Sequence, residues 1–239
     1  LALHLLAPSL LPSDEYTLKY APAVGRVVEG VTEVETSVML NNRVVSVTTM
    51  STCARISCLR NQAPVQIQLQ RFTIMQPLRC GESSNGLCSP DTIEARLRRA
   101  RTDTVTIDRS PNASLASKNS KPTPFGQYRT MAFVPPTSPV SVMGTWTYDD
   151  AETTVDSSHK FTAYDSVHIT YRLGRIHDSS GVRYAEVSAT VEQVISGAVA
   201  LGTTTNRGKG KVFHTIEVES GILVRASGSI HLDGDVAAK

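Results

Sequence analysis

Apolar and polar residues alternate one by one along most of the run from His159 to Leu232. Successive side chains of a β-strand point to opposite faces, so this alternation predicts strands with one buried face and one solvated face. The pattern falls into four stretches, separated by turn-like segments at 177–181, 202–210 and 220–221. It is typical of an antiparallel sheet that packs on a core with one face only.

Composition narrows the fold class further. The chain has 239 residues, of which 40% are hydrophobic and only 5% aromatic. The core is therefore expected to consist mainly of Val, Ile, Leu and Ala, which suits a sandwich or barrel. We predict an all-β fold, an antiparallel and jelly-roll-like β-sandwich with long loops and one short helix near 90–101. An extended arm is expected over 1–25, and a single domain over 26–239, with a long loop or link at 108–140.

The first half of the chain adds further strand signals. A β pattern begins near Gly25 and continues to Met50, and the polar pair Asn41–Asn42 predicts a hairpin within it. Val65, Ile67 and Leu69 alternate with glutamines over 65–70, which predicts a strand. A further short strand is expected over 102–107.

The helix is predicted from capping signals. Ser89 suits the N-cap, Pro90 suits the first helical position, and Asp91 and Glu94 favour the positive end of the helix dipole. Four arginines load the opposite end, where cations are favoured. They are Arg96, Arg98, Arg99 and Arg101.

All four cysteines lie within a short stretch of the first half. They are Cys53, Cys58, Cys80 and Cys88. Four cysteines allow three pairings, and their spacing does not select one. Local disulfides and free buried thiols both fit the sequence. A zinc site is disfavoured, because the spacings are long and no His lies nearby. Asn112 begins an Asn-Ala-Ser sequon and is a candidate glycosylation site if the chain is secreted.

No catalytic, cofactor or metal signature is recognised. His177, Asp178 and Ser179 are consecutive, so their side chains would point apart, and a turn explains them better. The strand histidines His168, His214 and His231 are not expected to converge. The acidic residues between Asp149 and Asp156 predict a solvated loop, because they lack the spacing of a calcium loop.

One basic segment remains as a candidate binding element. Arg207, Lys209 and Lys211 alternate with glycines in what the pattern predicts to be a hairpin tip. Together with the four arginines of the helix they are candidates for contact with nucleic acid or an acidic partner. The net charge of +2 gives no bulk electrostatic support for nucleic-acid binding.

Two functional hypotheses follow. The lead hypothesis is a non-enzymatic structural protein that self-assembles, most concretely a capsid or shell subunit located in a virion, with copies of itself or sibling subunits as partners. Jelly-roll shells of small icosahedral viruses share the low aromatic content, long loops and N-terminal arm. The alternative is a secreted or surface β-sandwich that binds a receptor or glycan. No membrane span is expected, because no apolar run approaches the roughly 20 residues required.

Overall fold

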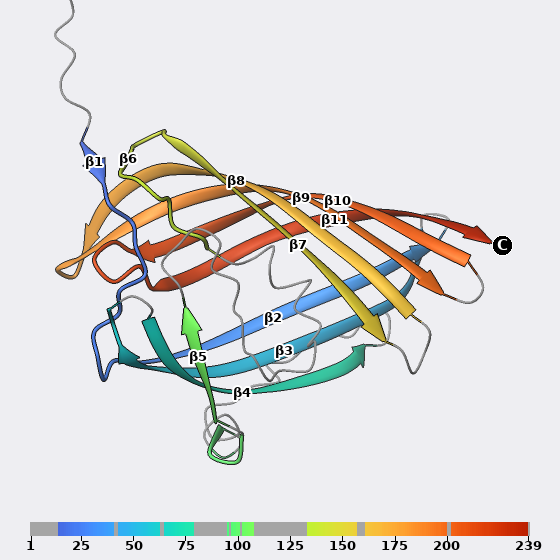
Figure 1. The fold of residues 1–239 in the computed structure, drawn as a ribbon, viewed down its shortest axis with the longest axis horizontal. Coiled ribbons are helices and arrows are strands. Elements are labelled where there is room, and N and C mark those ends of the chain that lie inside the picture. The colour runs from blue at the N-terminus through green and yellow to red at the C-terminus, as the bar shows by residue number, and fades with distance from the viewer. Residues whose placement is uncertain are drawn as a thin grey trace, which may run out of the picture. The chain divides into compact units, whose positions relative to one another are not determined.

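A computed structural model describes the chain in several segments. These are residues 14–40, 43–62, 65–78, 95, 97–100, 102–107, 133–156, 161–199 and 202–238. The strands in them are arranged as antiparallel sheets, which confirms the all-β prediction (Figure 1). The chain divides into two compact units. One contains the described residues of 14–21 and 133–238, and the other those of 22–107.

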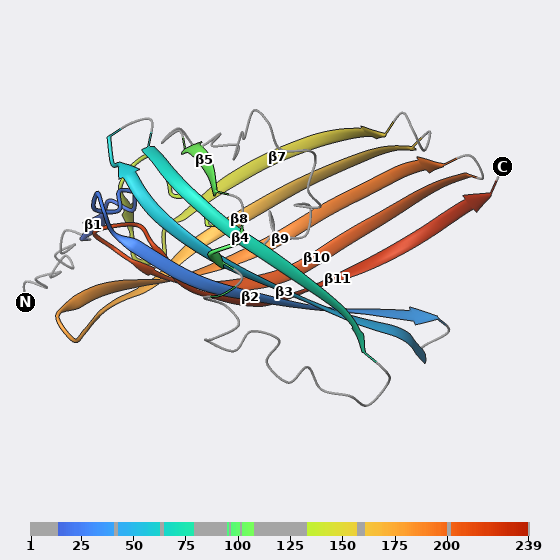
Figure 2. The same ribbon diagram turned by 90° about the horizontal axis from the view of Figure 1, so that it is seen from below.

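A five-stranded antiparallel sheet dominates the first unit. Its strands are β7 (Thr145–Asp156), β8 (Phe161–Ser179), β9 (Val182–Val199), β10 (Gly202–Glu217) and β11 (Leu223–Ala238). They lie side by side in chain order as long, curved strands (Figure 2). This is a meander, whereas a jelly roll requires Greek-key connections.

Two parts of this sheet differ from the prediction. The acidic stretch from Asp149 to Asp156 belongs to strand β7 and is not a loop. Residues 202–210 form the first half of β10, so Arg207, Lys209 and Lys211 lie within a strand and not at a hairpin tip. The turn between β8 and β9 is confined to Ser180 and Gly181, whose φ angles of 52° and 78° fit a two-residue type I′ turn.

The inner face of the five-stranded sheet carries the core. Its largest fully buried side chain is Tyr171, and Trp146 stacks on this ring with centroids 5.2 Å apart. Phe133 packs edge-on against both rings. Burial raises the pKa of Tyr171 well above its ordinary value. The aliphatic part of this core follows the predicted parity and includes Val167, Ile169, Leu173, Val187, Val191, Val212 and Ile216.

Glycines on the inner face of β10 and β11 each lie opposite a larger residue. Gly210 pairs with Ile230, Gly208 with Leu232, and Gly228 with Val212. A Cβ atom on Gly210 would lie 2.7 Å from both the Cα and the Cγ1 atoms of Ile230. The small residue therefore gives room to the large one across each pair.

The second unit contains a four-stranded antiparallel meander. Its strands are β2 (Val27–Leu40), β3 (Arg43–Arg60), β4 (Val65–Leu78) and β5 (Thr102–Ile107). Leu40 pairs with Arg43, which confirms the hairpin at Asn41–Asn42. Val65 is fully buried and Gln68 is exposed, as the alternation in β4 predicts.

The described part of the predicted arm packs within the chain itself. Strand β1 (Glu15–Tyr16) pairs with β6 (Val140–Ser141), and Leu18 is buried in the core of the first unit. The Ala21 amide donates to the Ser220 carbonyl at 2.8 Å. These residues thus serve the core of their own unit.

Most of the predicted helix lies outside the described residues. Ala95 and Leu97 are helical, and residues 98–100 turn, with the Ala100 amide donating to the Leu97 carbonyl at 3.1 Å. No complete helix is among the described elements. Of the predicted link at 108–140, residues 133–139 are irregular and the segment before them lies outside the described part.

Candidate interaction surface

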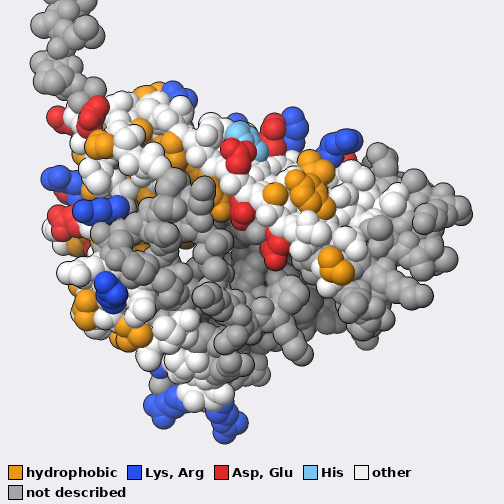
Figure 3. All heavy atoms as spheres, in the orientation of Figure 1, with side chains coloured by type: hydrophobic (Ala, Val, Ile, Leu, Met, Phe, Trp, Pro, Cys, Tyr) orange, Lys and Arg blue, Asp and Glu red, His pale blue; other side chains and the backbone are white. Residues whose placement is uncertain are grey.

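The outer face of the five-stranded sheet carries a charged row that crosses all five strands. Strand register places Asp149 beside His168, His168 beside Glu192, Glu192 beside Lys209, and Lys209 beside His231. Every one of these residues is exposed. In the space-filling view, acidic, basic and histidine side chains lie next to one another over this sheet (Figure 3).

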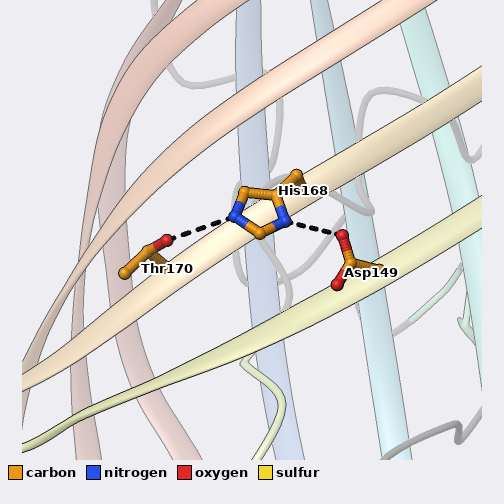
Figure 4. A network of polar contacts seen from close by, with 3 residues as sticks. All are labelled: Asp149, His168 and Thr170. Atoms are coloured by element: carbon orange, nitrogen blue, oxygen red, sulfur yellow. Dashed lines mark hydrogen bonds and ion pairs between the residues drawn. The ribbon is translucent and has the colours of Figure 1, made fainter.

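Asp149 and His168 form the shortest contact of the row. The His168 Nδ1 and Asp149 Oδ1 atoms are 2.6 Å apart, and Nε2 lies 3.4 Å from the Thr170 hydroxyl, so the imidazole is held between β7 and its own strand (Figure 4). Asp149, His168 and Thr170 follow one another in the order carboxylate, imidazole and hydroxyl, which is also the order of the groups in a catalytic triad. Catalysis of acyl transfer would also need backbone donors aimed at an oxyanion. In a central strand such as β8 the backbone amides are used in the ladders to β7 and β9.

Acidic side chains also lie close to a lysine or a histidine in the rest of the row. Lys209 Nζ lies 3.1 Å from Glu192 Oε1, and His231 Nε2 lies 3.1 Å from Asp233 Oδ1. Two shallow open depressions adjoin at Glu192, one reaching Asp149 and the other reaching His231. Exposed ion pairs of this kind contribute about 0–1 kcal/mol each, so the row shapes the surface more than it stabilises the sheet.

The basic residues of β10 form a stripe along this face. Arg207, Lys209 and Lys211 occupy alternate positions, so all three point outward, and they are spaced by about 7 Å along the strand. Arg98 and Arg99 are exposed in the second unit, while Arg96 and Arg101 lie outside the described residues. Contact of either group with nucleic acid or an acidic partner stays a prediction.

A second polar cluster lies near the turn between β8 and β9. Arg175 Nη2 donates to Glu186 Oε1 at 2.7 Å, and this hydrogen bond lowers the pKa of Glu186 and raises that of Arg175. Arg183 Nε donates to Asp178 Oδ1 at 3.2 Å across the same hairpin. His177, Asp178 and Ser179 occupy successive positions of β8, so they alternate between faces.

Strand β11 is one of the two edge strands of this sheet, the other being β7. Among the described residues β11 pairs only with β10, and it is 16 residues long. Its apolar side chains are partly exposed, with Leu232 43% and Val224 56% exposed. A long edge strand with exposed apolar residues is a template for pairing with another chain.

Of the predicted disulfide and glycosylation residues, the structure describes Cys53 and Cys58. Cys58 is a buried free thiol whose Sγ donates to the Pro22 carbonyl at 3.4 Å. Cys53 and Cys58 lie in one strand, β3, where five residues span about 16 Å, so a disulfide between these two would require a change of backbone. Cys80, Cys88 and Asn112 lie outside the described residues.

Sequence reasoning missed the Asp149–His168 pair and the edge strand. The available signal for the pair was period-two alternation at Trp146 and Tyr148, which continues through Asp150 and places Asp149 on the solvated parity. The three strand histidines do not converge, because His214 is buried on the inner face and His231 lies three strands from His168.

Comparisons with protein-family models, curated proteins and solved structures give no match to this chain. Within the described segments, no helix has the length and apolar character to cross a membrane. No cluster of three or more His, Cys, Asp or Glu side chains suited to a metal ion is found in the same segments.

Proposed function

We propose that this protein is a non-enzymatic structural protein that assembles with copies of itself, and that a shell subunit of a virion is its most concrete form. The observation that carries the proposal is the open edge of β11. This edge offers a long row of backbone donors and acceptors, and it is paired on one side only among the described residues.

The chemistry of the outer face supports a structural role in preference to catalysis. Asp149, Glu192 and Asp233 are each within ion-pairing distance of a neighbouring His or Lys on the same surface. The face is also open, and its depressions are shallow, whereas ligand sites of enzymes are usually concave and bury most of the ligand.

The test is size-exclusion chromatography with light scattering, with absorbance recorded at 260 and 280 nm. We expect a homogeneous species with a mass of at least two chains, each of 25.8 kDa. A monomer at every accessible concentration would contradict self-assembly and would favour a surface or secreted binding module.

Nucleic acid is the proposed second partner, through the basic stripe of β10. In that case the assembled species carries excess absorbance at 260 nm, and the double variant Arg207→Gln/Lys211→Gln reduces it. Arg172→Gln, which removes one charge from the same exposed face of β8, serves as the control. Particles free of nucleic acid would reject this partner and leave self-assembly intact.

A further inference from the structure

We infer that two copies of the chain associate by antiparallel pairing of their β11 strands, with Ser229 of one copy opposite Ser229 of the other. The inference rests on the proposed self-assembly and specifies its contact. Pairing of like edges about a two-fold axis is isologous, so it joins two five-stranded sheets and consumes both β11 edges.

The charges on the edge strands of the two sheets favour β11 over the others. Strands β7 and β2 carry only acidic residues among their charged side chains, so self-pairing would place carboxylates near carboxylates. These are Asp149, Asp150, Glu152 and Asp156 in β7, and Glu29, Glu33 and Glu35 in β2. Charges of one sign on an edge strand oppose edge-to-edge association. The remaining edge, β5, has only six residues.

Strand β11 instead carries both signs, at opposite ends. Arg225 is the third residue of the strand, whereas Asp233 and Asp235 lie in its second half, and Arg225 and Asp233 are both exposed on the outer face. Antiparallel pairing centred on Ser229 places Arg225 opposite the partner's Asp233, and symmetry repeats that pair. Parallel pairing in register would place each charge beside its own copy, which is unfavourable.

The inner face of β11 supports the same register. Centring on Ser229 places Gly228 opposite Ile230 and Ala226 opposite Leu232. This repeats the arrangement within the sheet, where Gly210 faces Ile230 and Gly208 faces Leu232. The contact would cover the exposed part of Leu232. A shift by one residue would bring outer-face residues of one copy onto the inner side of the other, so only even shifts keep the two faces.

Cysteine crosslinking tests the register directly. Directly opposed residues of antiparallel strands have Cβ atoms about 4.5–5.5 Å apart, so Ser229→Cys is expected to form a disulfide-linked dimer under mild oxidation. Ser227→Cys is the matched control, because it is an exposed serine on the same face of the same strand. In the inferred register Ser227 lies opposite His231, so the two copies of residue 227 are about 13 Å apart and beyond disulfide reach.

Charge variants test the same contact without a crosslink. Arg225→Asp alone and Asp233→Arg alone each place like charges opposite one another, and each is expected to be monomeric. An equimolar mixture of the two restores both Arg–Asp pairs and is expected to give a heterodimer. Arg172→Asp makes the same charge change on β8, an interior strand away from the β11 edge, and is expected to leave association unchanged.

The outcomes separate this inference from the proposed function. Crosslinking of Ser229→Cys without crosslinking of Ser227→Cys or the wild type supports it. Crosslinking of Ser227→Cys in place of Ser229→Cys overturns the register. A wild-type protein that assembles while neither variant crosslinks overturns the β11 contact and leaves self-assembly standing. A monomeric wild type with no crosslinking overturns both.

Discussion

The two faces of the five-stranded sheet use the same strands for opposite purposes. On the inner face, Tyr171, Trp146 and Phe133 pack against aliphatic side chains, and each position is constrained by its neighbours. On the outer face, Asp149 contacts His168 and Lys209 contacts Glu192, and each of these exposed contacts joins neighbouring strands. Since adjacent residues of one strand belong to different faces, the core and the surface can change independently. Adjacent substitutions therefore provide natural pairs for testing this division.

The largest contrast is expected at Tyr171 and its neighbour Thr170. Tyr171→Ala removes a fully buried ring from the aromatic cluster and is expected to cost about 3–5 kcal/mol, whereas Thr170→Ala on the outer face is expected to cost less than about 1 kcal/mol. Denaturant unfolding followed by the fluorescence of Trp146, the single tryptophan, measures both, because this residue stacks on Tyr171.

Tyr171→Phe keeps the measurement informative if the alanine variant does not fold. It preserves the ring and removes the hydroxyl, which interacts with the backbone of Val134, so a loss of about 1 kcal/mol is expected. Equal costs for Tyr171→Ala and Thr170→Ala would contradict the division between the faces.

A smaller contrast is expected at Gly210 and Lys209. Replacing glycine by alanine within a strand normally helps, but here the added Cβ would lie 2.7 Å from the Ile230 Cα atom. Gly210→Ala is therefore expected to destabilise the sheet by about 1–3 kcal/mol, while Lys209→Ala changes stability by about 0.5 kcal/mol or less. The same denaturation experiment compares them. A Gly210→Ala variant as stable as the wild type would show that β10 and β11 can separate to accept the methyl group.

The period of two made most of the inner face predictable from the sequence. The parity of Val167, Ile169, Tyr171 and Leu173 and the hairpin at Asn41–Asn42 are confirmed, because local alternation and turn chemistry determine them. The first half of β10 was missed, since glycines occupy its inner positions 208 and 210 and cations occupy its outer positions 207 and 209. Glycines at alternate positions read as a flexible turn, although the alternation of Gly208 and Gly210 with charged residues is itself a strand pattern.

The outer surface was less predictable because it depends on register between strands. Asp149 and His168 are 19 residues apart, and only the pairing of β7 with β8 brings them to 2.6 Å. The same holds for Lys209 and Glu192, which meet through the pairing of β9 with β10. Exposed polar residues occur both in loops and on the solvated face of strands. Their residue types alone therefore do not specify which side chains they contact. The edge position of β11 likewise follows from the order of the whole sheet.

The smallest effect is expected at Glu186, and it depends on pH. The hydrogen bond from Arg175 lowers the pKa of Glu186 in the folded chain below its ordinary value of 4.5. A lowered pKa means that the folded state favours the carboxylate, so this contribution is present above the unfolded pKa and is lost as the pH falls through the folded pKa. Glu186→Gln is therefore expected to lower Tm slightly at about pH 7, and the difference is expected to shrink as the pH falls below 4.5, the ordinary pKa of Glu186. The Arg175 side chain is 70% exposed and that of Glu186 is 40% exposed, so solvent screens the pair and the shift in Tm should be far smaller than that of Tyr171→Ala. Thermal unfolding of the two proteins across this range measures it, with Glu192→Gln as a control for loss of an acidic residue on the same face. A difference that persists unchanged at low pH would show that Glu186 acts through packing of its side chain and not through its charge.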